Sequence, residues 1–214
     1  MNHVSKSRWL ELMEFLGCTG PRMEFWYDRL ERMWSEKHRS YHTFQHLDEC
    51  LEELDEIEGD EEKLALIEVA LWFHDAIHRP LADDNEEQSA ALAREFLAEC
   101  DATPSVVEFV SDMILATKKH ECGGDPDVEI MVGLDLSIFA RDAKRFDLYE
   151  KQIREEYSAV PEEEYRNKRA AILQGFLNRK AIYASAMLRD VYEEQARLNL
   201  AWSIKRLESG EKIS

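Results

Sequence analysis

Apolar residues recur along most of the chain at the three- and four-residue spacing of α-helices, and no segment alternates as a half-buried strand does. This pattern predicts helices over about 7–17, 21–33, 41–57, 61–78, 85–100 and 104–120. A short apolar helix follows over 128–140, after a clear loop at 123–127, and two or three long amphipathic helices fill 141–207. The sequence therefore predicts an all-α bundle of about eight to ten helices.

The predicted helix ends carry residue types that favour them. Ser7, Asp60 and Asp84 stand where an N-cap side chain would accept a hydrogen bond from the backbone. Pro161 and the segment 178–180 are the expected breaks between the long C-terminal helices. These signals indicate separate helices joined by short turns.

The helix predicted over 61–78 changes character along its length. It begins with charged residues and becomes almost entirely apolar at LIEVALWF, directly before His74 and Asp75. A helix that is apolar on all sides is buried on all sides, so these two polar side chains are expected at the inner end of a buried helix. Because unpaired polar groups are costly there, we expect either a hydrogen-bonded His–Asp pair or a bound cation.

The balance of charge limits which partners the chain can have. Its 214 residues include 45 Asp and Glu against 27 Lys and Arg, a formal net charge of −18. Such a surface repels nucleic acids and anionic membranes, so neither is an expected partner. A small phosphorylated substrate is compatible with this charge, provided that a local positive centre such as a metal ion binds it.

Composition also bears on compartment and organisation. Four cysteines occur without a C-x-x-C pair and are expected to be reduced, buried or half-buried thiols: Cys18, Cys50, Cys100 and Cys122. The first residues mix charges and lack the apolar run of a signal peptide, and no stretch approaches the ~20 apolar residues of a membrane span. We therefore expect a cytoplasmic protein with a single domain over 1–214, and homo-oligomer formation stays open.

Histidines and aspartates stand at positions that point to a metal site. His42 and His46 are four residues apart, so on a helix both imidazoles would project from one face, although one packed and one solvated ring fits this spacing equally well. Asp135 is a lone carboxylate in the apolar segment MVGLDLSIF, where few positions face solvent. Two histidines and two aspartates directed inward from three helices would form a mixed nitrogen and oxygen set. Such a set suits Mn, Fe, Co, Ni or Zn better than Mg or Ca.

The order His, His-Asp, Asp resembles the HD superfamily of metal-dependent phosphohydrolases, and more narrowly its bacterial branch of predicted HD-type phosphohydrolases. The matching segments lie in the family's order over about 39–179: RSYHTFQH, LWFHDAIH, DNEEQSA, ILATKKH, LDLSIF, IREEY and EEYRNKRAAILQGFLNR. The resemblance implies an HD-type helical domain with its core at about 39–180 and terminal helices packed on it. It also implies one divalent metal ion per chain, with four ligands: His46, His74, Asp75 and Asp135.

The resemblance further implies a hydrolytic mechanism in which metal-activated water is the nucleophile. In related cyclic-nucleotide phosphodiesterases the first His of a similar Tyr-His-x-x-x-His segment protonates the leaving oxygen, and His42 holds that place. Asp75 and Glu86 complete the candidate catalytic set. Lys118 and His120 are candidates for binding the phosphate group, and a solvated basic helix end accounts for them equally well.

The chain departs from the superfamily pattern at two places. Members with two metals usually carry a His-Glu pair downstream of the HD, where this chain has Asn85 and Glu86, so a second ion is in doubt. Some single-metal nucleotidase relatives carry a catalytic Glu where this chain has His78, and both Glu86 and His78 are candidates for that task. The expected function is hydrolysis of a small, nucleotide-like phosphate mono- or diester. A metal- and nucleotide-binding sensor without turnover and an HD-type iron oxygenase are the alternatives.

Overall fold

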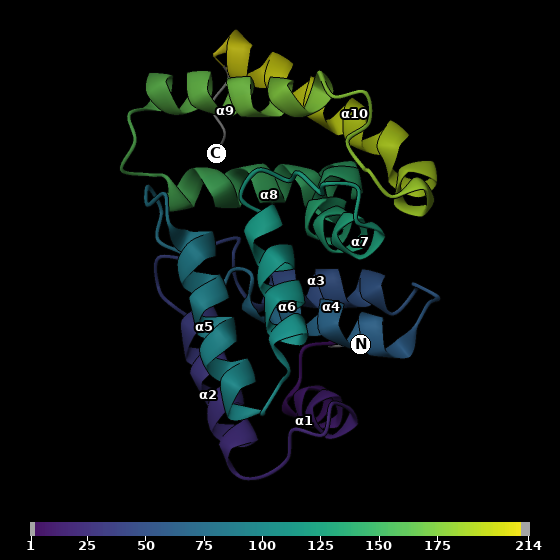
Figure 1. Ribbon diagram of the computed structural model, residues 1–214. Coiled ribbons are helices and arrows are strands. Elements are labelled where there is room, and N and C mark those ends of the chain that lie inside the picture. The colour runs from purple at the N-terminus through teal and green to yellow at the C-terminus, as the bar shows by residue number, and fades with distance from the viewer. Residues whose placement is uncertain (1–2, 211–214) are drawn as a thin grey trace. The chain divides into compact units, whose positions relative to one another are not determined.

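The structure, a computed structural model, describes residues 3–210, and ten α-helices and one 3-10 helix account for the regular structure in that range (Figure 1). The predicted all-α class is confirmed. No helix of residues 3–210 is long and apolar enough to cross a membrane. The chain divides into two compact units, Met1–Asp135 and Leu136–Ser214. That both belong to one domain stays a prediction.

The first unit is organised around a buried central helix, α4. Seven helices of this unit lie in the described range: α1 Lys6–Phe15, α2 Arg22–Trp34, α3 Phe44–Leu54, α4 Glu61–Phe73, α5 Asn85–Glu99, α6 Pro104–Ala116 and α7 Pro126–Asp135. Helix α4 packs against α3, α5, α6 and α7, and every residue from Val69 to Phe73 is buried. The apolar run of the sequence is therefore surrounded by other helices, as its composition indicates.

Aromatic side chains fill the space between the N-terminal helices and α4. Trp9 and Trp26 each have ring centroids 5.3 Å from that of Phe96, and Phe73 stacks on the same ring at 5.1 Å. All four side chains are fully buried. Large aromatic residues bury much apolar surface, and replacing one by Ala typically costs about 3–5 kcal/mol. This cluster therefore fixes α1, α2 and α5 around the end of α4 that leads to His74.

Two of the three predicted N-cap positions, Asp60 and Asp84, are confirmed, and the third, Ser7, is wrong. Asp60 caps α4 as predicted, since its side chain accepts a hydrogen bond from Lys63 N at 3.1 Å. Helix α1, however, is capped by Ser5, whose hydroxyl accepts from Arg8 N, so Ser7 already lies inside the helix. Asp84 is the N-cap of α5, but its side chain accepts no hydrogen bond from the first backbone N–H groups of that helix.

The helix boundaries near the candidate ligands also differ from the prediction. Helix α3 begins at Phe44, so His42 lies on the preceding turn and does not share a helical face with His46. Helix α4 ends at Phe73, which leaves His74 and Asp75 on a turn instead of inside a helix reaching residue 78. Helix α7 ends at Asp135 and a 3-10 helix follows.

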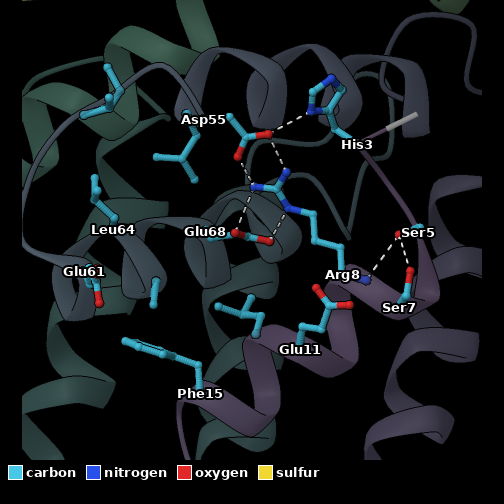
Figure 2. Close-up of a pocket in the computed structure, with 14 residues that line it drawn as sticks. His3, Ser5, Ser7, Arg8, Glu11, Phe15, Asp55, Glu61, Leu64 and Glu68 are labelled. Carbon is cyan, nitrogen blue, oxygen red and sulfur yellow. Dashed lines mark hydrogen bonds and ion pairs between the residues drawn. The ribbon is translucent and has the colours of Figure 1, made fainter. Parts of the chain in front are cut away.

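An arginine joins three segments of the first unit at its surface. The guanidinium of Arg8 binds both carboxylate oxygens of Asp55 at 2.8 Å and those of Glu68 at 2.8 and 3.0 Å (Figure 2). His3 Nδ1 lies 2.8 Å from the same Asp55 carboxylate. These contacts tie α1 to the end of α3 and to α4, beside a cleft of about 780 Å³ with acidic and apolar walls.

The second unit consists of one 3-10 helix and three long α-helices in the described range: η1 Leu136–Ala140, α8 Ala143–Glu156, α9 Glu162–Leu177 and α10 Ala186–Ser209. Helix α10 packs against α9, α8 and η1. The predicted breaks are confirmed, since Pro161 immediately precedes α9 and Asn178 is its C-cap.

A buried ion pair connects the three α-helices of the second unit. Arg169 of α9 binds Glu150 of α8 at 2.5 Å and the Tyr149 hydroxyl at 2.7 Å. The second oxygen of Glu150 accepts a hydrogen bond from Ser203 of α10 at 2.7 Å. Removing one partner of such a pair leaves an uncompensated buried charge, which typically costs about 3–5 kcal/mol. Each of the three α-helices thus supplies part of one polar network.

Candidate metal centre

His46 lies in the first turn of α3 and points into the first unit. The Thr43 side chain caps α3 by accepting a hydrogen bond from Gln45 N at 3.2 Å, which fixes where the helix begins. The Tyr41 hydroxyl lies 2.9 Å from His46 Nδ1 and sets the orientation of the ring. His46 Nε2 is therefore directed toward His74, and only 2% of the His46 side chain is exposed.

His74 is the C-cap of α4, and the backbone of that helix fixes its ring. Its Nδ1 lies 2.8 Å from the carbonyl oxygen of Leu71. Because a carbonyl only accepts, Nδ1 carries a proton, and in the neutral ring Nε2 keeps its lone pair facing the site. Metal-bound histidines are commonly held in this way, with the second ring nitrogen donating to a carbonyl or carboxylate.

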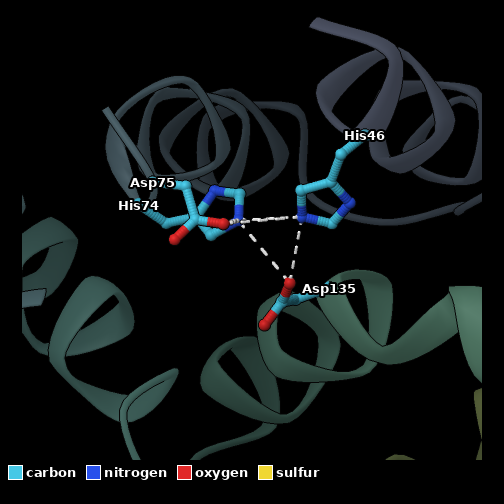
Figure 3. A group of neighbouring side chains, drawn as sticks. All are labelled: His46, His74, Asp75 and Asp135. Atoms are coloured by element: carbon cyan, nitrogen blue, oxygen red, sulfur yellow. Dashed lines mark hydrogen bonds and ion pairs between the residues drawn. The ribbon is translucent and has the colours of Figure 1, made fainter. Parts of the chain in front are cut away.

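Two carboxylates complete the cluster from different segments. Asp75 follows His74 on the turn, and its Oδ2 lies 3.2 Å from His74 Nε2. Asp135, the last residue of α7, brings its Oδ1 to 3.2 Å from His46 Nε2 and 3.5 Å from His74 Nε2. Figure 3 shows the four side chains pointing toward one another from α3, the end of α4 and the end of α7. The segments that carry the candidate ligands thus converge at one point.

The spacing and chemistry of this group fit a divalent ion. The four ligand atoms all lie within 4.8 Å of one another. Ligands bonded to one ion at about 2.0–2.2 Å are themselves separated by about 3.0–3.6 Å, which is close to the shortest distances in this cluster. Two imidazole nitrogens with two carboxylate oxygens are donors typical of Zn, Mn, Fe, Co or Ni sites. His46, His74, Asp75 and Asp135 could therefore hold a metal ion.

The electrostatics of the cluster favour a cation. Burial alone would lower the pKa of His74, but the charge of Asp75 and the hydrogen bonds and charge of Asp135 raise that pKa well above its usual range. Burial likewise opposes ionisation of the two carboxyl groups, yet the neighbouring histidines hold the pKa of each below its usual range. Both carboxylates are therefore ionised, and a proton on a histidine balances part of their charge. A divalent ion would take over that role and displace the proton.

Arg39 fixes the two turns that carry His42 and Asp75. Its side chain is fully buried, and its Nη1 donates to the carbonyl oxygens of His42 at 3.0 Å and Asp75 at 2.7 Å. Its Nη2 donates to the Ala76 carbonyl at 2.9 Å and to Glu36 at 3.0 Å. Arg39 thus links the turn before α3 to the turn after α4.

Two further histidines lie at the edge of the cluster. His42 Nε2 is 3.9 Å from Asp75 Oδ2, and the His42 ring stacks on the ring of His78 with centroids 4.0 Å apart. His120 Nε2 is 3.3 Å from Asp135 Oδ2. His120 has a positive φ of 52°, a conformation that is uncommon for residues other than glycine and is enriched at functional sites. The two rings therefore contact different carboxylates of the cluster.

The other two candidate residues, Lys118 and Glu86, make no hydrogen bond or ion pair with the four candidate ligands in the part of the chain that the structure describes. Lys118 binds the carboxylate of Glu87 and the carbonyl oxygen of Asp83. Glu86 is half-buried in the first turn of α5, and within residues 3–210 it makes no ion pair with the four candidate ligands. The substrate role of Lys118 and the catalytic role of Glu86 stay predictions.

Sequence reasoning missed the residues that support the ligands. Tyr41 and Arg39 were not singled out, although both belong to the segment RSYHTFQH that holds His42 and His46. Trp34 of α2 lies just beyond the end predicted for that helix, at residue 33, and its ring centroid lies 6.4 Å from that of His46 and 5.7 Å from that of His74. The nearness of Arg39 and Tyr41 to the histidines in sequence is the one signal that could have found them.

Comparisons of the chain with family models, with curated proteins and with solved structures find no match.

Proposed function

We propose that the chain is a metal-dependent phosphohydrolase of the HD type that acts on a small nucleotide or another phosphate ester. The observation that carries the proposal is the convergence of four side chains of suitable donor type at one point: His46, His74, Asp75 and Asp135. Their order along the chain and the segments around them resemble the HD superfamily. The ion would be one of Mn, Fe, Co, Ni or Zn.

A divalent ion in this site would supply hydroxide near neutral pH and polarise a phosphoryl oxygen. His46 and His74 would hold it from the buried side, since they are 2% and 1% exposed. Asp75 and Asp135 keep 17% and 14% exposure, so a substrate would approach along the carboxylate side.

The two histidines at the edge of the cluster would act on the substrate. His42, 18% exposed and next to Asp75, would donate a proton to the leaving oxygen as general acid. His120, next to Asp135, would donate a hydrogen bond to a non-bridging phosphate oxygen. Phosphoryl transfer depends chiefly on positioning and charge neutralisation, so few further groups are needed.

The charge of the first unit supports a metal-dependent way of binding phosphate. Residues 1–135 contain 12 Lys and Arg against 32 Asp and Glu. An anionic substrate is therefore repelled by most of this unit and needs a concentrated local positive charge. A divalent ion with His42 and His120 beside it would provide that charge.

The test is a screen of phosphorylated metabolites, including mono- and diesters, against protein stripped by a chelator and reloaded separately with Mn, Fe, Co, Ni, Zn and Mg. We expect release of phosphate or of a nucleotide by one or more metal-loaded forms, and none by the stripped protein or by Asp135→Asn. Tight nucleotide binding without turnover at full metal occupancy would instead make the chain a sensor. Two irons per chain with oxygen consumption would make it an oxygenase.

A further inference from the structure

One face of α10 is apolar and uncovered. Met187, Val191, Leu198 and Trp202 are 42%, 67%, 59% and 46% exposed, and together they make up four of the nine large apolar side chains that are exposed within residues 3–210. A helix turns by 100° per residue, so these four positions fall within an arc of about 60°. They form two apolar pairs on one side of the helix, Met187 with Val191 and Leu198 with Trp202, and the exposed Glu194 lies between the pairs at the edge of the arc. These four residues are here called the α10 strip.

The α10 strip is separate from the face with which α10 packs into its own unit. The buried residues of α10 include Leu188, Ala196, Leu200, Ile204 and Leu207. Helix α10 is therefore apolar on two faces, and its unit covers only one of them. A helix with apolar residues on both faces normally buries both. The α10 strip thus has the composition of a contact surface.

The spacing within the strip indicates what covers it. The four residues are separated by 4, 7 and 4 positions, so the strip reads the same in both directions along the helix. In a two-fold symmetric dimer each contact between residues i and j occurs twice, which requires a self-complementary surface. An antiparallel pair of α10 helices, with its axis between Glu194 and Gln195, would place Met187 against Trp202 and Val191 against Leu198 of the second copy.

From this self-complementarity we infer that the α10 strip is the interface of a homodimer. Residues 136–214 contain 15 Lys and Arg against 13 Asp and Glu, so two copies of this unit do not repel as two copies of residues 1–135 would. The inference concerns the second unit alone and does not depend on the proposed activity.

The first test is the oligomeric state of the full chain by sedimentation velocity over a range of concentrations. The wild type should dimerise, and Val191→Lys with Leu198→Lys should weaken the dimer by about a hundredfold or more, because the contact between Val191 and Leu198 occurs twice in the dimer and charges replace both residues. Ile172→Lys is the matched control: this residue of α9 is 52% exposed and lies outside the α10 strip, so the dimer should persist. A wild type that is monomeric at every concentration, or equal weakening by the control, would overturn the inference.

The second test fixes the register by oxidative cross-linking. At the proposed axis the two copies of residue 194 are offset by one residue, about 1.5 Å along the helix, whereas the two copies of residue 187 are offset by about 22 Å. Glu194→Cys should therefore form a disulfide-linked dimer and Met187→Cys should not, with wild type measured alongside because it has four cysteines of its own. In a parallel pair every position faces itself, so cross-linking of Met187→Cys would rule out the antiparallel arrangement.

Discussion

At the scale of single residues, three of the four candidate ligands are held by a neighbour that is not itself a ligand. Tyr41 holds the ring of His46, the Leu71 carbonyl holds the ring of His74, and Arg39 holds the backbone at Asp75. Neighbours of this kind fix the tautomer and direction of a ligand before the ion arrives. The site is therefore preorganised by its supporting residues, and substitutions can separate ligand roles from catalytic ones.

His42→Ala should separate acid catalysis from metal binding. The metal content should stay at the wild-type level, because His46 is the proposed ligand and His42, whose Nε2 lies 3.9 Å from Asp75 Oδ2, is not one of the four proposed ligands. Turnover should fall by about 10²–10⁴, which is the usual contribution of a positioned proton donor. The loss should be smaller for a nitrophenyl ester, whose leaving group needs no proton. Equal loss for good and poor leaving groups at full metal content would rule out the acid role.

Asp75→Ala should remove metal binding, and with it the stabilisation that metal provides. Wild type should melt at a higher temperature when metal is added, since a ligand at 100 times its Kd stabilises the folded state by about 2.7 kcal/mol. The variant should lose activity and show no such shift. Asp112→Ala, at an exposed position of α6, serves as the control and should respond as wild type does. Wild-type metal content in Asp75→Ala would show that Asp75 has a structural role only.

At the scale of elements, periodicity predicted the helices but not how they end. The apolar run before His74 correctly indicated a buried helix, because burial on all sides follows from composition alone. The end of α4 at Phe73 could not be predicted, since the carbonyls of Asp75 and Ala76 are bound by Arg39, 36 and 37 residues earlier in the chain. Contacts between residues so far apart in the chain cannot be predicted from the local spacing of apolar and polar residues. The same limit explains why His42 and His46 were assigned to one helix although a turn separates them.

Arg39→Met tests whether this contact between elements is needed. The free energy of unfolding of the variant should be lower by about 1.5–3 kcal/mol, because the carbonyl oxygens of His42, Asp75 and Ala76 lose the buried guanidinium that donates to them. Metal affinity should fall as well, since the turn that carries His74 and Asp75 is no longer held. Chemical denaturation and metal titration measure the two effects, and Arg32→Met at an exposed position of α2 is the control. Unchanged metal affinity in Arg39→Met would show that the turn carrying His74 and Asp75 keeps its conformation without Arg39.

The contact of Arg8 with Asp55 should make stability depend on pH in a defined direction. Partial burial opposes ionisation of Asp55, but hydrogen bonds from Arg8 and His3 outweigh it and lower the pKa of this carboxyl. A carboxyl group whose pKa is lower in the folded protein than in the unfolded chain stabilises the folded state. This contribution is complete above the unfolded pKa of about 3.9, and it disappears as pH falls through the folded pKa. Asp55→Asn should therefore be less stable than wild type at neutral pH, and the difference should vanish in acid. Glu58→Gln, at an exposed position, should show no such convergence.

At the scale of the whole molecule, charge is distributed very unevenly along the chain. Residues 1–135 hold 32 of the 45 acidic residues and all four candidate metal ligands. The same negative field attracts a metal cation and repels a phosphorylated substrate. The sequence alone gives this imbalance, whereas the placement of the candidate ligands within the acidic unit required the fold.

This field should give metal and substrate opposite salt dependences in one protein. Raising potassium chloride from about 0.02 to 0.2 M shortens the screening length from roughly 20 Å to below 10 Å, so long-range attraction and repulsion both weaken. The metal Kd should rise several-fold, and the KM for a dianionic phosphomonoester should fall several-fold at saturating metal. A monoanionic diester should show the smaller change in KM, because its interaction with the field is halved. A KM that rises with salt would show that the positive charge at the site attracts the substrate more strongly than the acidic residues of this unit repel it. Most of the substrate affinity would then come from the ion, His42 and His120.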